Sequence, residues 1–132
     1  MKIMIVDNDL TYLGLLSEVL KLHGYDVVTA MQGEEALSKL RENDVNLIIS
    51  DISMPKMNGM SLHRYVRQDP RLREVPFAWN SMYRELRDVV EIEDPALDLK
   101  FDKAMPVPNL LSFLSHFTAL QRQKTGGQEL TS

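Results

Sequence analysis

The chain has 132 residues, of which 44% are hydrophobic and 26% are charged, with a formal net charge of -4 and no cysteine. One domain of this length buries about two thirds of its unfolded surface, which is enough for a stable core without cross-links such as disulfides. The lack of cysteine excludes disulfides and thiolate chemistry, and it fits a cytoplasmic protein. The negative charge disfavours direct nucleic-acid binding, and no apolar run approaches the roughly 20 residues of a membrane span, so we expect neither as a partner.

Strands and helices are predicted to alternate along the chain, from runs of apolar and β-branched residues and from leucines at helical spacing. In chain order we predict a strand at 2–6, a helix from 10 that Gly24 closes, a strand at 26–30, a helix at 33–42, a strand at 46–50, a helix at 60–68, a strand at 77–81, a helix at 83–93, a strand at 97–101 and a helix at 109–121. Residues 123–132 are polar and contain two glycines. We predict one domain over residues 1–122 and a flexible tail or truncated linker over 123–132.

Five strand–helix alternations predict an α/β fold, a parallel sheet with helices on both faces. In such sheets, ligands bind beyond the carboxyl ends of the strands, near the point where the strand order reverses. Polar residues follow four of the predicted strand ends: Asp7, Asp51, Ser81 and Lys103. Carboxylates suit Mg²⁺ or act as nucleophiles toward phosphorus, and a hydroxyl and an ammonium can hold phosphoryl oxygens.

Two phosphoryl-handling families share features with these strand ends. Asp7-Asn8-Asp9-Leu10-Thr11 resembles the nucleophile motif of haloacid-dehalogenase-type phosphatases, with Asp7 and Asp9 as its acids. The segment "IISDISMPKMNG" resembles the phosphoacceptor segment of response-regulator receiver domains of two-component systems. The order and spacing of Asp7, Asp51, Ser81 and Lys103 are also similar to that family, over residues 2–121. The helix directly after Leu10 disfavours the phosphatase, which places a loop and hairpin flap there.

The receiver resemblance implies a flavodoxin-like, doubly wound sheet of five parallel strands in the order 2-1-3-4-5. It also implies roles for single residues. Asp51 is then the phosphoacceptor, and Asp7, Asn8, Asp51 and the backbone carbonyl of Ser53 hold Mg²⁺. Ser81 and Lys103 would contact the phosphoryl group.

Five positions are uncertain or depart from the family pattern. Asn8 stands where a second metal-binding acid is usual, and we expect it to weaken Mg²⁺ binding by about one to two powers of ten. Asp9 is a candidate N-cap that could also turn toward the metal. Met82 replaces a small residue, and Lys100 replaces the aromatic residue of the family's switch. Ala104 replaces a proline whose preceding peptide bond is cis, and we expect a trans bond instead, since a non-proline cis bond costs about 2.5–4 kcal/mol.

The resemblance implies a signalling switch domain, which catalyses only its own phosphorylation and dephosphorylation. The phosphoryl group would come from a histidine kinase or a histidine phosphotransfer protein, and the downstream effector is not identified. The alternative is a degenerate receiver that binds proteins without being phosphorylated. The departures at Asn8, Met82, Lys100 and Ala104 favour that alternative, whereas Asp51, Ser81 and Lys103 favour phosphorylation.

Other residues with reactive or metal-binding side chains form no motif. His23, His63 and His116 lie on different predicted helices without metal-ligand spacing, and we interpret them as surface or packing residues. Trp79 is predicted to be buried in its strand, and Asn80 is an unusual polar member of the same strand.

Overall fold

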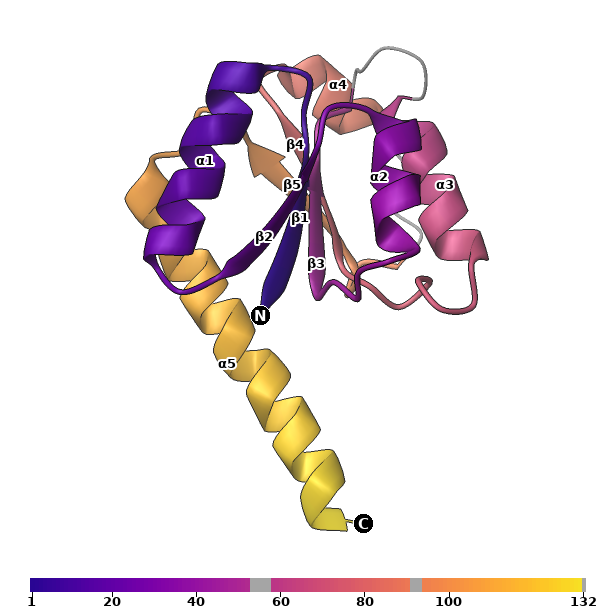
Figure 1. Ribbon diagram of the computed structural model, residues 1–132, viewed down its shortest axis with the longest axis vertical. Helices are drawn as coiled ribbons and strands as arrows, with labels where there is room; N and C mark the ends of the chain where they lie inside the picture. The colour runs from indigo at the N-terminus through magenta and orange to yellow at the C-terminus, as the bar shows by residue number, and fades with distance from the viewer. Residues whose placement is uncertain (53–57, 91–93, 132) are drawn as a thin grey trace.

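Five parallel strands form one sheet in the order β2-β1-β3-β4-β5 (Figure 1). The computed structural model describes residues 1–52, 58–90 and 94–131. The strands are β1 (Lys2–Val6), β2 (Asp26–Ala30), β3 (Leu47–Ser50), β4 (Phe77–Ser81) and β5 (Asp98–Asp102). Val6 of β1 lies opposite both Ala30 of β2 and Ser50 of β3. The strand order therefore reverses at β1, which confirms the predicted doubly wound sheet.

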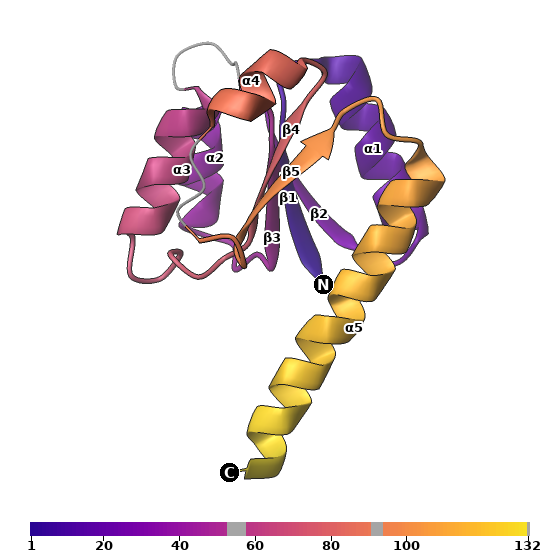
Figure 2. The same cartoon turned by 180° about the vertical axis from the view of Figure 1, so that it is seen from behind.

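The helices cover both faces of this sheet. α1 (Leu10–Leu22) and α5 (Val107–Thr131) lie on one face, and α2 (Gly33–Leu40) and α3 (Gly59–Gln68) lie on the other (Figures 1 and 2). The short α4 (Arg84–Val89) packs Leu86 against the α2–α3 side. Among the described residues, no helix is long and apolar enough to cross a membrane.

The alternation of side chains along β1 explains why both faces are covered. Ile3 and Ile5 join the apolar cluster under α1 and α5, whereas Met4 and Val6 join the cluster under α2 and α3. All four are at most 1% exposed. A strand buried on both faces has an unbroken apolar sequence, which is the pattern that predicted it.

Several predicted element limits are wrong by one or two residues, as expected where helix ends fray. α2 ends at Leu40 and β5 is shifted by one residue, to Asp98–Asp102. α4 covers only Arg84–Val89 of the predicted 83–93, and residues 91–93 of that prediction lie outside the described residues. The end of α1 is as predicted, because Gly24 follows the C-cap with a φ of 88°, a conformation that glycine favours.

The largest correction concerns the last helix, which was predicted to end at residue 121. α5 continues to Thr131, so its C-terminal part extends away from the sheet and from the other helices (Figures 1 and 2). The two glycines do not end this helix, although each costs about 1 kcal/mol relative to alanine. The domain limits of 1–122 and 123–132 remain predictions.

The start of α3 is packed against the end of β3. Asn58 caps the helix, because its Oδ1 accepts a hydrogen bond from the Ser61 N–H at 2.9 Å. The Gly59 N–H donates to the carbonyl of Ile52 at 2.8 Å. A Cβ atom at position 59 would collide with the backbone carbonyl of Asp51. Only glycine therefore allows α3 to begin this close to Asp51.

We predict that Gly59→Ala lowers the free energy of unfolding by about 1–3 kcal/mol, since the new methyl group forces the backbone around Asp51 to shift. Gly14→Ala is the matched control. Gly14 lies in α1, and an added Cβ would meet no other atom within 4 Å there. We expect that substitution to stabilise the protein by about 0.5–1 kcal/mol, because alanine favours the helix. Urea unfolding followed by circular dichroism measures both, and equal effects would contradict the close approach.

Candidate functional site

Two carboxylates lie side by side at the carboxyl ends of β1 and β3. Asp7 follows Val6 directly, and its N–H donates to the carbonyl of Ala30 at 3.0 Å. The Asp51 N–H donates to the carbonyl of Val6 at 2.9 Å. These bonds extend the parallel ladder by one residue, so the sheet itself fixes the backbone of both aspartates.

The ammonium group of Lys103 lies between these carboxylates. Its Nζ is 2.6 Å from Oδ2 of Asp7 and 3.7 Å from Oδ2 of Asp51. The Lys103 side chain is 10% exposed, and those of Asp7 and Asp51 are 1% and 15% exposed. Two acidic groups in so little water need a cation, and Lys103 supplies it from the far edge of the sheet.

The charges around Lys103 also set its protonation. Burial alone would lower its pKa, but the hydrogen bond and charge of Asp7, together with the charge of Asp51, outweigh burial and raise the pKa above the ordinary 10.5. A group with a raised pKa stabilises the fold fully below its unfolded pKa and loses that contribution as pH rises through the folded value. The site therefore keeps its ammonium throughout the neutral range and loses it only in strongly alkaline solution.

Backbone amides hold the remaining carboxylate oxygens in place. Oδ1 of Asp7 accepts a hydrogen bond from the Asp9 N–H at 2.9 Å. Oδ1 of Asp51 accepts from the Ile52 N–H at 2.7 Å. Each carboxylate thus has one oxygen that accepts from a nearby backbone N–H and another that faces Lys103.

Asp9 caps α1, as one of the two sequence alternatives predicted. Its Oδ1 accepts a hydrogen bond from the Tyr12 N–H at 3.1 Å, which satisfies one of the free amides at the helix start. Asp9 therefore does not take the place of the missing acid at position 8 in this conformation. Asn8 is exposed beside Asp7. The predicted metal ligand at Ser53 lies outside the described residues.

Ser81 connects the end of β4 to both neighbouring segments. Its side chain is buried, and its Oγ accepts a hydrogen bond from the Tyr83 N–H at 3.1 Å. Its carbonyl accepts from the Lys103 N–H at 3.0 Å, so the backbone of Lys103 is held against β4. Met82, which replaces a small residue of the family pattern, is 58% exposed and thus is not packed into the site.

The loop after β5 differs from the family pattern in the predicted way. The Lys103–Ala104 bond is trans, since no cis bond occurs in the described residues. The Ala104 N–H donates to Oδ1 of Asp102 at 2.8 Å, which closes the turn. Lys103 lies closer to Asp7 than to Asp51. Lys100 is exposed on β5.

Tyr12 and Asn80 also border the site, in roles that the sequence pattern did not predict. Nδ2 of Asn80 donates a hydrogen bond to the hydroxyl of Tyr12 at 2.7 Å, and the Tyr12 ring centroid is 4.6 Å from Nζ of Lys103. Burial raises the pKa of Tyr12, as do the charges of Asp7 and Asp51, so its hydroxyl stays protonated. The one available indication was Asn80 itself, an amide within an apolar strand.

His63 is buried in a charged cluster, a role that its interpretation as a surface or packing residue did not include. It is 1% exposed and contacts Oδ1 of Asp98 at 2.9 Å, and Arg67 contacts the same oxygen at 2.5 Å. Burial alone would raise the pKa of Asp98, but hydrogen bonds from His63 and Arg67 lower it. Asp98 begins β5, so this cluster lies at the opposite end of that strand from Lys103. Trp79 is fully buried beside His63, as predicted.

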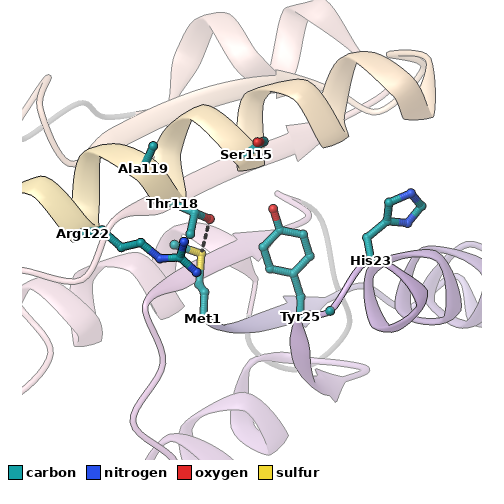
Figure 3. A pocket seen from close by; sticks show the side chains of 8 residues that line it. Met1, His23, Tyr25, Ser115, Thr118, Ala119 and Arg122 are labelled. Atoms are coloured by element: carbon teal, nitrogen blue, oxygen red, sulfur yellow. Dashed lines mark hydrogen bonds between the residues drawn. The ribbon is translucent and has the colours of Figure 1, made fainter.

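Of two hollows in the described part of the molecule, one is remote from these residues and the other borders them. Figure 3 shows one of about 320 Å³ between α5 and the start of β2, with Tyr25 and His23 on one side and Arg122 on the other. Because it adjoins the beginnings of the strands, it is remote from Asp7 and Asp51. A smaller hollow of about 170 Å³ between α1 and α5 borders Lys103, and apolar side chains form most of its lining.

The donor set at the strand ends fits a hard cation. Asp7 and Asp51 offer carboxylate oxygens, and Asn8 adds an amide beside them. Within the described ranges, no three acidic or imidazole side chains converge as a closed metal cage. Mg²⁺ keeps several waters and needs only one or two protein carboxylates, so this set suits it better than it suits zinc.

Known proteins resemble this chain in sequence. It matches the response regulator receiver domain family over residues 3–114. It is 41% identical over 78 residues to chemotaxis protein CheY1 of Helicobacter pylori, covering 58% of this chain and 63% of CheY1. It is 43% identical over 67 residues to the CpxR homolog of Haemophilus influenzae, covering 51% of this chain and 29% of that regulator. These matches span less than two thirds of either relative.

Solved structures agree with this match. Chemotaxis response regulator CheY4 of Vibrio cholerae has a TM-score of 0.73 at 26% identity, covering 87% of this chain and 96% of CheY4. Response regulator TrrA of Thermotoga maritima, solved in complex with Mg²⁺ and BeF, has a TM-score of 0.74 at 27% identity, with the same coverage of both chains. The chain belongs to the response regulator receiver domain family, a family of signalling domains. Asp7 and Asp9 also resembled a phosphatase motif, and this assignment decides between the two families in favour of the receiver domain.

We predict that Lys103→Met lowers the free energy of unfolding by about 3 kcal/mol, because it leaves two nearly buried carboxylates without their cation. Mg²⁺ should restore part of this loss and stabilise the variant more than the wild type, since the ion replaces the missing charge. Urea unfolding with and without MgCl₂ measures both effects.

Lys100→Met is the matched control for Lys103→Met, because Lys100 is exposed on the adjoining strand. We expect a change within about 0.5 kcal/mol and no added response to Mg²⁺. If the two variants behaved alike, Lys103 would not be the cation on which the carboxylates depend.

Proposed function

We propose that this domain accepts a phosphoryl group on Asp51 and changes a partner-binding surface in response. The observation that carries the proposal is the position of Lys103, whose ammonium lies within reach of both Asp7 and Asp51. A nucleophilic carboxylate needs nearby positive charge to hold the oxygens of the incoming phosphoryl group. Asp51 is also the more exposed of the two carboxylates, which favours it as the one that reacts.

The reaction is a transfer between side chains. An oxygen of Asp51 bonds to the phosphorus atom while the phosphorus–nitrogen bond of a donor phosphohistidine breaks, and the electron pair returns to that imidazole. Mg²⁺, when bound, neutralises charge on the phosphoryl oxygens. Lys103 would contact one of these oxygens. The Ser81 hydroxyl could donate to another, because within the described part of the chain it only accepts, from Tyr83.

The proposed partners follow from this chemistry. The donor is a histidine kinase or a histidine phosphotransfer protein, and the domain catalyses only its own phosphorylation and dephosphorylation. The phosphoryl group carries about -1.5 to -2 charges, while the Asp51 carboxylate loses its own charge on forming the acyl phosphate. The rim therefore becomes more negative by up to about one charge, enough to rearrange nearby polar contacts. Ser81 would move toward the phosphoryl group and alter the face formed by α4, β5 and α5. The cytoplasmic location remains a prediction. The effector and the activity of the whole protein are not identified.

We expect acetyl phosphate with Mg²⁺ to add the mass of one phosphoryl group to the wild type and to leave Asp51→Asn unmodified, because an amide is a poor nucleophile. Asp9→Asn is the matched control. It is an equally good helix cap outside the reacting pair, so it should be modified like the wild type. Intact mass spectrometry is the measurement. A wild type that stays unmodified with acetyl phosphate and with a phosphorylated histidine donor would support the degenerate receiver instead.

We also propose that Mg²⁺ binds weakly because residue 8 is an amide. Asn8→Asp should tighten Mg²⁺ binding about tenfold, since it adds a charged oxygen ligand beside Asp7. Asn46→Asp places the same substitution just before β3, at the amino-terminal end of the strands and away from Asp7, and should leave the affinity unchanged. Calorimetric titration with MgCl₂ distinguishes the two, and equal affinities for all three proteins would show that residue 8 does not limit binding.

A further inference from the structure

The surface next to Ser81 lacks the side chain that the resemblance assigns to the switch. Lys100 stands in place of an aromatic residue on β5, and its side chain is exposed. It shares a strand face with Asp98 and Asp102, because side chains alternate along the strand. A flexible, hydrated ammonium cannot fill and vacate an apolar space as an aromatic ring does. If a movement of Ser81 is passed on to the surface around Lys100, it must therefore be passed on by other contacts.

α4 is attached to Ser81 at two points. The Ser81 Oγ accepts a hydrogen bond from the Tyr83 N–H, at the start of the helix. The Ser81 carbonyl accepts a second from Nη1 of Arg87 at 2.5 Å, one turn further along. The Arg87 side chain is only 16% exposed, so water competes little for this bond. Side chain and backbone of one residue thus hold both ends of the first turn of α4.

Arg87 also reaches the end of β5. Its Nη1 is 3.7 Å from Oδ1 of Asp102, the residue before Lys103. The Ser81 carbonyl that accepts from Arg87 also accepts from the backbone N–H of Lys103. One guanidinium therefore joins α4, the end of β4 and the start of the loop that carries Lys103.

Within the described residues, apolar contacts also help to fix this short helix, since Leu86 and the buried C-cap residue Val90 join the cluster under α2 and α3. α4 has six residues and no side-chain hydrogen bond at its N-cap. A helix this short is not stable by its own backbone bonds, so its position depends on tertiary contacts. Leu86 contributes apolar packing on the α2–α3 side, and Arg87 contributes the polar contact.

We propose that Arg87 is the positioning residue that couples Ser81 to α4, in place of the aromatic residue absent from position 100. The proposal rests on the proposed phosphorylation of Asp51. When the Ser81 hydroxyl turns to the phosphoryl group, it releases the Tyr83 N–H. The Ser81 backbone moves with it, and Arg87 transmits this movement to α4 because its planar guanidinium holds the carbonyl while staying close to Asp102.

The test measures the response of α4 to modification, not its stability alone. Amide hydrogen exchange over residues 82–90 is compared in the full chain with and without beryllofluoride and Mg²⁺. In the wild type we expect exchange in this segment to change about tenfold, the value of one hydrogen bond to a charged group. In Arg87→Ala the change should fall within about twofold, although acetyl phosphate still modifies Asp51.

Two further variants separate coupling from simple stabilisation of the helix. Arg84→Ala removes another arginine of α4, which is 82% exposed and pairs with Asp88 at 3.9 Å, and it should respond like the wild type. Arg87→Lys keeps a donor in reach of the Ser81 carbonyl and should recover part of the response. A response in Arg87→Ala equal to that of Arg84→Ala would overturn the proposal.

The outcomes also distinguish this proposal from the one on which it rests. If neither acetyl phosphate nor beryllofluoride modified the wild type at Asp51, the proposed function would fail, and the role of Arg87 with it. If Asp51 were modified in every variant while α4 responded equally in all of them, only the role of Arg87 would fail.

Discussion

The ion pair between Lys103 and Asp7 is the constraint on which the site depends. The sheet places two carboxylates at the ends of adjacent strands, where their like charges repel each other. Lys103 offsets this repulsion from 2.6 Å and 3.7 Å. It comes from beyond β5, the edge strand, so the carboxylates have this cation only when β5 has joined the sheet.

The packing of both faces fixes where these charges lie. β1 and β3 are buried on both sides, which leaves their carboxyl ends as the places where polar residues can follow them. The close start of α3, enforced at Gly59, lies directly against the backbone of Asp51 and Ile52 at the end of β3. On the other face, Tyr12 of α1 lies over the Lys103 ammonium and receives a hydrogen bond from Asn80. The ammonium therefore has an aromatic ring near it as well as two carboxylates.

The corner formed by β4, α4 and β5 combines a serine typical of the family with charged residues where the family pattern has an aromatic residue. Ser81 is buried at the strand end, as a phosphoryl-binding hydroxyl would be, yet both its side chain and its carbonyl also hold α4. Arg87 and Asp102 supply charge on the surface where an aromatic side chain is absent. Ionic contacts of this kind are directional and sensitive to salt, so a signal carried by them would differ in character from one carried by apolar packing.

The sequence by itself determined the fold class, the strand order through the family resemblance, and the identity of the polar residues at the strand ends. It could do so because apolar runs and strand-end positions are local features of the chain. Only the tertiary structure decided that Asp9 caps α1, that Asn80 bonds to Tyr12 and that His63 pairs with Asp98, since each of these side chains had more than one possible partner. The length of α5 was also misjudged, because two glycines give a strong local stop that helix propagation can overcome. The same holds for Arg87, whose contacts with Ser81 and Asp102 exist only where two strands and a helix meet.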